Sequence, residues 1–143
     1  MTIEEYLNRC RDLRKRAEKK KRKYEDLRSA ASSTAVAFDR NGGGKIKDPR
    51  GRENVLAAMV DAGQEAELAE LDYIECRHNL FMQLIRLPNR DESEVLIMRY
   101  VEEQDIVDVC KALSTGRRNV FRYLRTGKDR LREQLQGSGL DIE

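Results

Sequence analysis

The chain has 143 residues, of which 38% are charged, 39% hydrophobic and 6% aromatic, with no Trp and only two Pro. This composition supplies a modest apolar core but not a deep, dry active-site cavity, and no apolar run is long enough to span a bilayer. The first ten residues, MTIEEYLNRC, carry acids where a secretory signal needs an apolar stretch, and the three cysteines form no CxxC pair. We therefore expect a cytoplasmic protein with reduced thiols.

The charges are sorted along the chain, although the net charge is only +2. Residues 1–38 and 114–136 each carry a net charge of +5, whereas residues 53–113 carry −9. The distribution of charge along the sequence says more about binding partners than the net charge does. Two basic blocks, at residues 14–23 and 117–132, therefore need an explanation.

The first predicted element is a long helix over residues 3–38. Its apolar residues recur in steps of four and three, which is the pattern of a coiled-coil seam, here with a polar break at Lys20. Thr2 and Glu5 have the spacing of a capping box at its start. The predicted seam consists of Tyr6, Cys10, Leu13, Ala17, Lys20, Tyr24, Leu27 and Ala31.

A second helix is predicted from Glu53 to about Leu87. Glycines at 42–44 break the first helix, and Pro88 ends the second. Because neither helix can bury its apolar stripe alone, the two should form an antiparallel hairpin over residues 1–88. The stripe expected on the second helix is Leu56, Val60, Leu71, Ile74, His78, Phe81 and Ile85.

The hairpin also offers an explanation for the first basic block. A turn centred near Ile46 would place residues 15–23 opposite roughly 69–77, close to the acids Glu65, Glu67, Glu70, Asp72 and Glu75. This arrangement favours ion pairing within the hairpin, and contact of Lys15–Lys23 with nucleic-acid phosphates is the alternative. The seam of the first helix likewise has two candidate partners, the second helix of the same chain or another copy of the protein in a homodimer.

Three shorter helices are predicted over residues 89–136. The first begins near Asp91, the second has Asp105 as its N-cap, and the third runs to about Gln136. No strand-like alternation occurs, so we expect an all-α protein, with residues 137–143 as a flexible tail. The inward-facing residues should be Val95, Leu96, Met98, Tyr100, Ile106, Val109, Cys110, Leu113, Val120, Tyr123, Leu124 and Leu131.

The second basic block lies on the last of these helices. The turn before it, Ser114-Thr115-Gly116, is too tight for an antiparallel hairpin. A helix with an apolar back and a cationic front has the width and chemistry to enter the DNA major groove, where Arg can bind guanine or phosphate and Phe can meet a thymine methyl. The candidate DNA-binding residues are Arg117, Arg118, Asn119, Phe121, Arg122 and Arg125, and secondary candidates for phosphate contacts are Lys128 and Arg130. Arg132, further along the same helix, is placed for phosphate contact or simple solvation.

The same segment resembles region 4 of bacterial sigma factors and the related helix-turn-helix domains of phage-encoded regulators. The run EVLIMRY at 94–100 resembles the family's run that ends in Leu-Arg-Tyr. Asp108-Val109-Cys110 takes the place of the family's Glu-Ile-Ala, and Asn119-Val120 that of Thr-Val. The turn departs from the family pattern, because Leu113-Ser114-Thr115-Gly116 replaces Leu-Gly-Ile-Ser. Position 114 thus lacks the usual glycine, and position 116 lacks the capping serine, for which Ser114 or Thr115 could substitute.

In size and layout, the whole chain is similar to small phage proteins of the ArpU/RinA-like late-transcription regulator type. This resemblance implies a sequence-specific DNA-binding transcription regulator, encoded by a phage or prophage and active in the bacterial cytoplasm. Double-stranded DNA would bind the C-terminal helices, and the hairpin would self-associate or contact RNA polymerase. The alternative is a protein-interaction adaptor that docks on RNA polymerase or another regulator without reading DNA.

Other sequence features have simpler explanations than a catalytic or metal site. The glycine run before Lys45 lacks the spacing of a P-loop. His78 has no nucleophile beside it in the sequence, and Cys76, His78 and Cys110 are too few and too isolated for a zinc site. We therefore predict no enzyme activity, no cofactor, no metal, no membrane partner and no small-molecule substrate.

Overall fold

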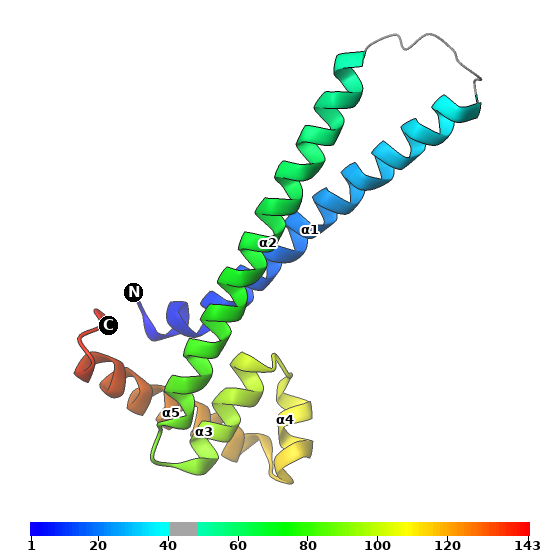
Figure 1. The fold of residues 1–143 in the computed structure, drawn as a ribbon. Coiled ribbons are helices and arrows are strands. Elements are labelled where there is room, and N and C mark those ends of the chain that lie inside the picture. The colour runs from blue at the N-terminus through cyan, green and yellow to red at the C-terminus, as the bar shows by residue number, and fades with distance from the viewer. Residues whose placement is uncertain (41–48) are drawn as a thin grey trace. The chain divides into compact units, whose positions relative to one another are not determined.

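The computed structural model describes the backbone of residues 1–40 and 49–143 and the side chains of residues 1–32 and 51–143. These residues form the helices α1 (Ile3–Arg40), α2 (Pro49–Ile85), α3 (Arg90–Leu96), α4 (Ile106–Leu113) and α5 (Arg117–Gly137), with a π-helical turn, η1 (Ile97–Val101), after α3 (Figure 1). No strand occurs in the described parts of the chain, so the all-α class is confirmed. The glycine break at 42–44 and the turn near Ile46 lie outside the described residues.

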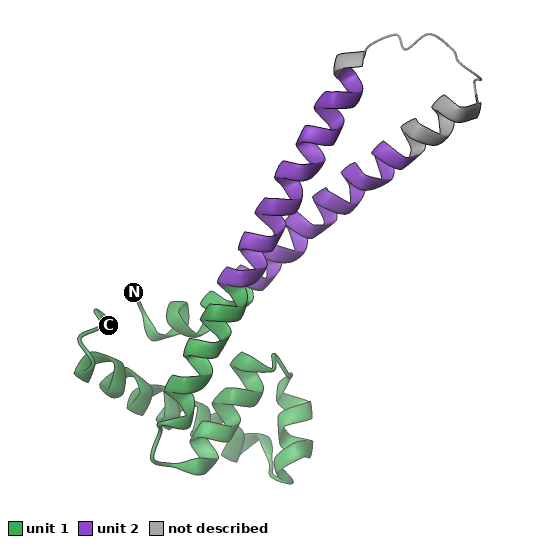
Figure 2. Cartoon of the chain, in the orientation of Figure 1, with its two compact units in different colours: residues 1–12, 73–143 green, residues 13–72 purple. Residues whose placement is uncertain are grey.

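The chain divides into two compact units (Figure 2). Unit 1 comprises residues 1–12 and 73–143, and unit 2 comprises residues 13–72. The division therefore differs from the expected boundary at residue 88. The reason is that Ile3 and Leu7 from the start of α1, together with the last turns of α2, belong to the same apolar cluster as the C-terminal helices.

Unit 2 is an antiparallel pair formed by the middle parts of α1 and α2. The predicted seam on α1 is confirmed, because all of its residues are buried or half-buried. At the polar break, Lys20 Nζ lies 3.2 Å from Glu65 Oε2, so opposite charges do face each other across the pair. Glu65 is one of the acids expected to face the basic block, but the register is shifted, since Lys20 was expected opposite 69–77; Tyr24 likewise lies against Gly63.

The stripe predicted on α2 is wrong. Its apolar members, Leu56, Val60, Leu71, Ile74, Phe81 and Ile85, are 39% to 61% exposed, and His78 is exposed as well. The side of α2 that is buried contains smaller residues, among them Ala62 and Ala69. Small residues let α1 approach closely: a Cβ on Gly63 would lie only 3.2 Å from Cε2 of Tyr24. The helix therefore has two apolar faces, and within unit 2 the one with the larger side chains is exposed.

Unit 1 has one apolar core, to which α3, η1, α4 and α5 contribute the residues predicted from the sequence. Val95, Leu96, Val109, Val120, Leu124 and Leu131 are buried, and the remaining predicted inward residues are half-buried against them. The predicted caps are also present. Thr2 N–H donates to Glu5 Oε2 at 2.9 Å and Glu5 N–H to Thr2 Oγ1 at 3.2 Å, while Asp105 Oδ1 accepts from the amide of Asp108 at 2.8 Å.

Part of the segment expected as a flexible tail, residues 137–143, is packed in the structure. Beyond the end of α5 at Gly137, the chain turns back and buries Ile142, which is only 6% exposed. Gln136 Nε2 donates to the carbonyl of Ile142 at 2.7 Å, and the amide of Glu143 donates to the carbonyl of Met1 at 2.9 Å. The burial of Ile142 was not predicted, because its neighbours Asp141 and Glu143 are charged.

None of the described helices combines sufficient length with sufficient apolarity to traverse a membrane.

Candidate nucleic-acid interface

The turn between α4 and α5 forms without the glycine that is usual there. Ser114 adopts the left-handed conformation, with φ 50° and ψ 45°, and its amide donates to the carbonyls of Cys110 and Lys111. These bonds satisfy the end of α4 in the manner that glycine normally permits, although a side chain in this conformation costs roughly 1–2 kcal/mol. The departure at position 114 is therefore accommodated by the backbone.

The start of α5 differs from the expectation that Ser114 or Thr115 would cap it. The N-cap is Gly116, which has no side chain to accept from the first turn. Thr115 Oγ1 instead accepts a hydrogen bond from Asn119 Nδ2 at 3.0 Å. The amides of the first turn of α5 thus have no side-chain acceptor at the cap, and the partial positive charge of the helix N-terminus adds to that of the arginines that follow.

The inner side of α5 is held by close packing against α3. Val120, Leu131 and Leu135 are fully buried on this side. At Gly127 the two helices come so near that a Cβ would lie 3.0 Å from Cδ1 of Leu96. Because this side of α5 is fixed against the core, the opposite side of the helix faces solvent.

A buried carboxylate also ties α5 to α3. The side chain of Glu92 is only 3% exposed; its Oε1 accepts from Thr126 Oγ1 at 2.8 Å, and its Oε2 lies 3.3 Å from Arg130 Nε. Arg130 was a secondary candidate for phosphate contact. The structure places it in an ion pair within the chain instead.

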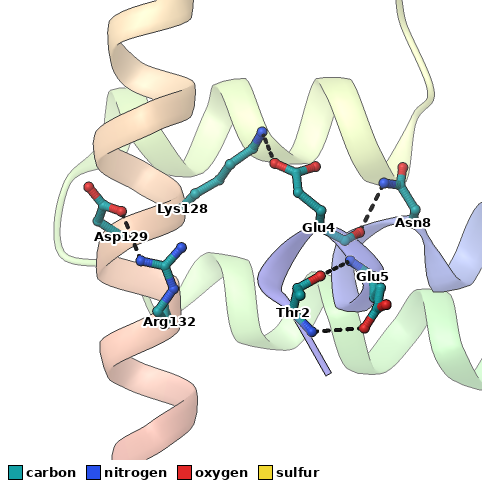
Figure 3. A network of polar contacts seen from close by, with 7 residues as sticks. All are labelled: Thr2, Glu4, Glu5, Asn8, Lys128, Asp129 and Arg132. Carbon is teal, nitrogen blue, oxygen red and sulfur yellow. Dashed lines mark hydrogen bonds and ion pairs between the residues drawn. The ribbon is translucent and has the colours of Figure 1, made fainter. Parts of the chain in front are cut away.

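Lys128, the other secondary candidate, is held in a polar network at the start of α1 (Figure 3). Its Nζ lies 2.6 Å from Glu4 Oε1 and 5.5 Å from the centre of the Tyr100 ring. Partial burial lowers the pKa of Lys128, but its hydrogen bonds to Glu4 and Tyr100 outweigh this effect, so the pKa is raised. Asn8 Nδ2 holds the same turn of α1 by donating to the carbonyl of Glu4 at 2.9 Å. Lys128 is therefore charged and already paired.

The six primary candidates for DNA binding are all exposed, whereas Lys128 and Arg130 are held in ion pairs. Arg118, Arg122 and Arg125 follow one another at helical spacing on the side of α5 opposite its buried residues. Phe121 lies beside them and is 54% exposed. The structure brings six exposed residues together over the first turns of α5, and we call this surface the α5 ridge: Arg117, Arg118, Asn119, Phe121, Arg122 and Arg125.

The arginines of the α5 ridge are not paired with any acid among the residues whose side chains are described. Among the described residues, none of the four forms an ion pair, and only Arg122 has a stacking contact, with its guanidinium carbon 5.2 Å from the centre of the Tyr123 ring. The ridge therefore presents four available guanidinium groups to solvent, each able to donate to a phosphate or to a base edge.

A groove of about 550 Å³ runs alongside the ridge. Phe121 and Arg125 form the border that it shares with the ridge, and Arg132 of α5 and Arg99 of η1 line it further along. Sequence reasoning considered Arg132 for phosphate contact or solvation but missed Arg99. Both are partly engaged, because Arg99 Nη1 donates to the carbonyl of Gln104 at 3.0 Å and Arg132 Nη1 lies 3.2 Å from Asp129 Oδ1 (Figure 3). Only the fold reveals that Arg99 lies beside this part of α5, since η1 and α5 are far apart in sequence.

The described side chains form no candidate metal site. In the portion of the chain whose side chains are described, no three His, Cys, Asp or Glu residues are grouped so that they could hold a metal ion. Cys10 and Cys76 do come together, with their sulfurs 2.9 Å apart, but His78 is exposed on the other side of α2.

The described helices define an all-α protein in which two long helices are followed by three shorter ones, and the last of these carries an exposed cationic ridge. A family model described as a protein of unknown function, DUF1492, matches residues 30–132, and the chain belongs to this family. The comparisons with curated proteins and with solved structures found no match.

Proposed function

We propose that this protein is a sequence-specific DNA-binding transcription regulator whose helix α5 enters the major groove. The observation that carries the proposal is the α5 ridge, whose four arginines are exposed and form no ion pair among the described residues, with Arg118, Arg122 and Arg125 opposite the buried side of the helix. The resemblance to sigma-factor region 4 assigns the same helix to recognition, and it supports a regulator encoded by a phage or prophage. RNA polymerase is then the natural second partner.

The geometry also ranks the basic residues within this proposal. Arg118 and Arg122 lie at the centre of the ridge and are exposed, so they are the residues assigned to base edges and to the nearest phosphates. Lys128 and Arg130 would have to give up their ion pairs with Glu4 and Glu92 before they could bind DNA. We therefore assign these two residues to holding α5 in place.

The test compares two double variants that remove the same charge. Arg118→Ala with Arg122→Ala removes two cations from the ridge, whereas Arg9→Ala with Arg86→Ala removes two exposed cations elsewhere in unit 1. Duplexes that the wild-type protein retains from a random pool are sequenced, and binding to the enriched duplex is measured as a function of salt. The ridge variant should lose enrichment and lower the salt slope by about 1.8, which is about 0.9 for each phosphate contact.

The control variant should enrich the same duplexes as the wild type, with a small loss of affinity. Equal binding by the two double variants would assign the interaction to overall charge and remove α5 from the recognition role. Failure of the wild type to shift any duplex at low salt would favour the alternative function, an adaptor that docks on another protein.

A further inference from the structure

The outer face of α2 carries a coiled-coil seam that has no partner within the described chain. The residues on this face are spaced alternately by four and three positions, as in a heptad repeat. The face consists of Val60, Gln64, Glu67, Leu71, Ile74, His78, Phe81 and Ile85. Its apolar members Val60, Leu71, Ile74, Phe81 and Ile85 are 39% to 61% exposed. At 1.5 Å per residue the seam is about 38 Å long.

The inner face of α2 is already occupied, so the exposed seam cannot be explained by the hairpin. Ala62 and Ala69 on the inner face are about 5% exposed or less, and Leu80 and Leu84 are buried in the core of unit 1. A helix that is apolar on two opposite faces is typical of one that is covered on both. A long exposed apolar stripe marks an interaction surface.

We infer that the occupant of this outer face is a second copy of the chain, whose α2 lies antiparallel to the first about a two-fold axis between Leu71 and Ile74. This arrangement pairs unlike residues in a self-complementary way. Leu71 meets Ile74 of the second copy, and Val60 meets Ile85 of the second copy. Each apolar pair occurs twice, once on either side of the axis.

The polar residues of the seam favour the antiparallel orientation of the two copies. In this register, the exposed His78 faces Glu67 of the second copy, and Gln64 faces Phe81. Beside the seam, the exposed Glu70 lies next to Arg77 of the second copy, so opposite charges flank the core.

The parallel orientation places like groups together. It would stack Glu67 on Glu67 and His78 on His78 inside the seam, and it would set Glu70 beside Glu75 of the second copy. Buried like charges are costly in an interface. The charge pattern therefore selects two antiparallel copies. This inference does not depend on α5, so a failure to bind DNA would leave it standing.

The first test is the mass of the particle by sedimentation equilibrium over a range of concentrations. The wild-type chain should reach twice its 16.6 kDa. Leu71→Glu should keep it at the mass of one chain, because two carboxylates would then be buried at the axis. Leu140→Glu is the matched control, since Leu140 is also an exposed leucine, at 47%, but lies outside α2. It should leave the dimer intact, and circular dichroism should show full helix content in both variants.

A charge exchange tests the orientation. Glu70→Arg and Arg77→Glu should each weaken the dimer by about tenfold in Kd, because each single variant places like charges together in both symmetric pairs. The double variant should return to the wild-type Kd. A wild-type chain that stays monomeric at every concentration would overturn the inference, as would a dimer that survives Leu71→Glu. A double variant weaker than either single one would overturn the antiparallel register.

Discussion

Replacing Gly127 with Ala should destabilise unit 1, although the same change inside an exposed helix would stabilise it. The favourable contribution is helix propensity, about 1 kcal/mol. Against it stands the contact that the new Cβ would make, 3.0 Å from Cδ1 of Leu96 and 3.2 Å from Cβ of Glu92. Leu96 is completely buried and cannot move aside without disturbing the core. Overpacking of this kind costs about 1–3 kcal/mol, so the net loss should be about 1 kcal/mol.

Urea unfolding followed by circular dichroism measures this loss directly. Gly137→Ala is the matched control, because Gly137 is also helical and belongs to α5, but a Cβ there has no atom within 4 Å. The control should be as stable as the wild type or slightly more stable. If Gly127→Ala matched or exceeded the stability of the wild type, the close approach of α3 and α5 would not limit this position, and the reasoning would fail.

Three further predictions concern other contacts of unit 1. Oxidised glutathione should join Cys10 to Cys76 by a disulfide within one chain, because their sulfurs are 2.9 Å apart. The reaction should be slow, because burial raises the pKa of the Cys10 thiol. Mass spectrometry should find that the chain has lost two hydrogens, and glutathione retained on the chain would contradict the pairing. Glu4→Gln should lower stability by about 0.5 kcal/mol at neutral pH. Since the pKa of Lys128 is raised, the stability difference between wild type and Glu4→Gln should be fully present below the ordinary lysine pKa of about 10.4 and disappear as pH rises through the folded-state pKa. Urea midpoints of both proteins at neutral and strongly alkaline pH measure the difference. A difference that persisted at alkaline pH would show that it does not arise from the ion pair with Lys128. Ile142→Ala should cost about 2 kcal/mol, and an unchanged urea midpoint would show that the C-terminal turn contributes no core packing.

The two long helices show what hydrophobic periodicity can and cannot predict. On α1 the sequence has one apolar stripe, so the predicted seam from Tyr6 to Ala31 is the buried one. On α2 there are two stripes, and periodicity selected the one with Leu71 and Phe81 because its side chains are larger. The hairpin buries the other stripe, where Ala69 and similar small residues allow close contact. Which stripe α1 covers depends on steric fit between helices, and this cannot be read from either helix alone.

The candidate site was largely predictable because its determinants are local. The spacing of Val120 and Leu124 sets the inner side of α5, and the arginines of the ridge then fall on the outer side. The acids that neutralise the secondary candidates could not be predicted in the same way. Glu4 and Glu92 are distant in sequence from Lys128 and Arg130, and only the packing of unit 1 brings them together.

The hydrogen bond between the amide of Glu143 and the carbonyl of Met1 brings the first and last residues of this sequence side by side in unit 1. A fluorescent donor attached at one of these ends and an acceptor at the other would exchange energy efficiently while unit 1 is folded. The signal would vanish when unit 1 opens, whatever happens in unit 2. Two dyes at the termini would thus follow the half of the molecule that carries the α5 ridge.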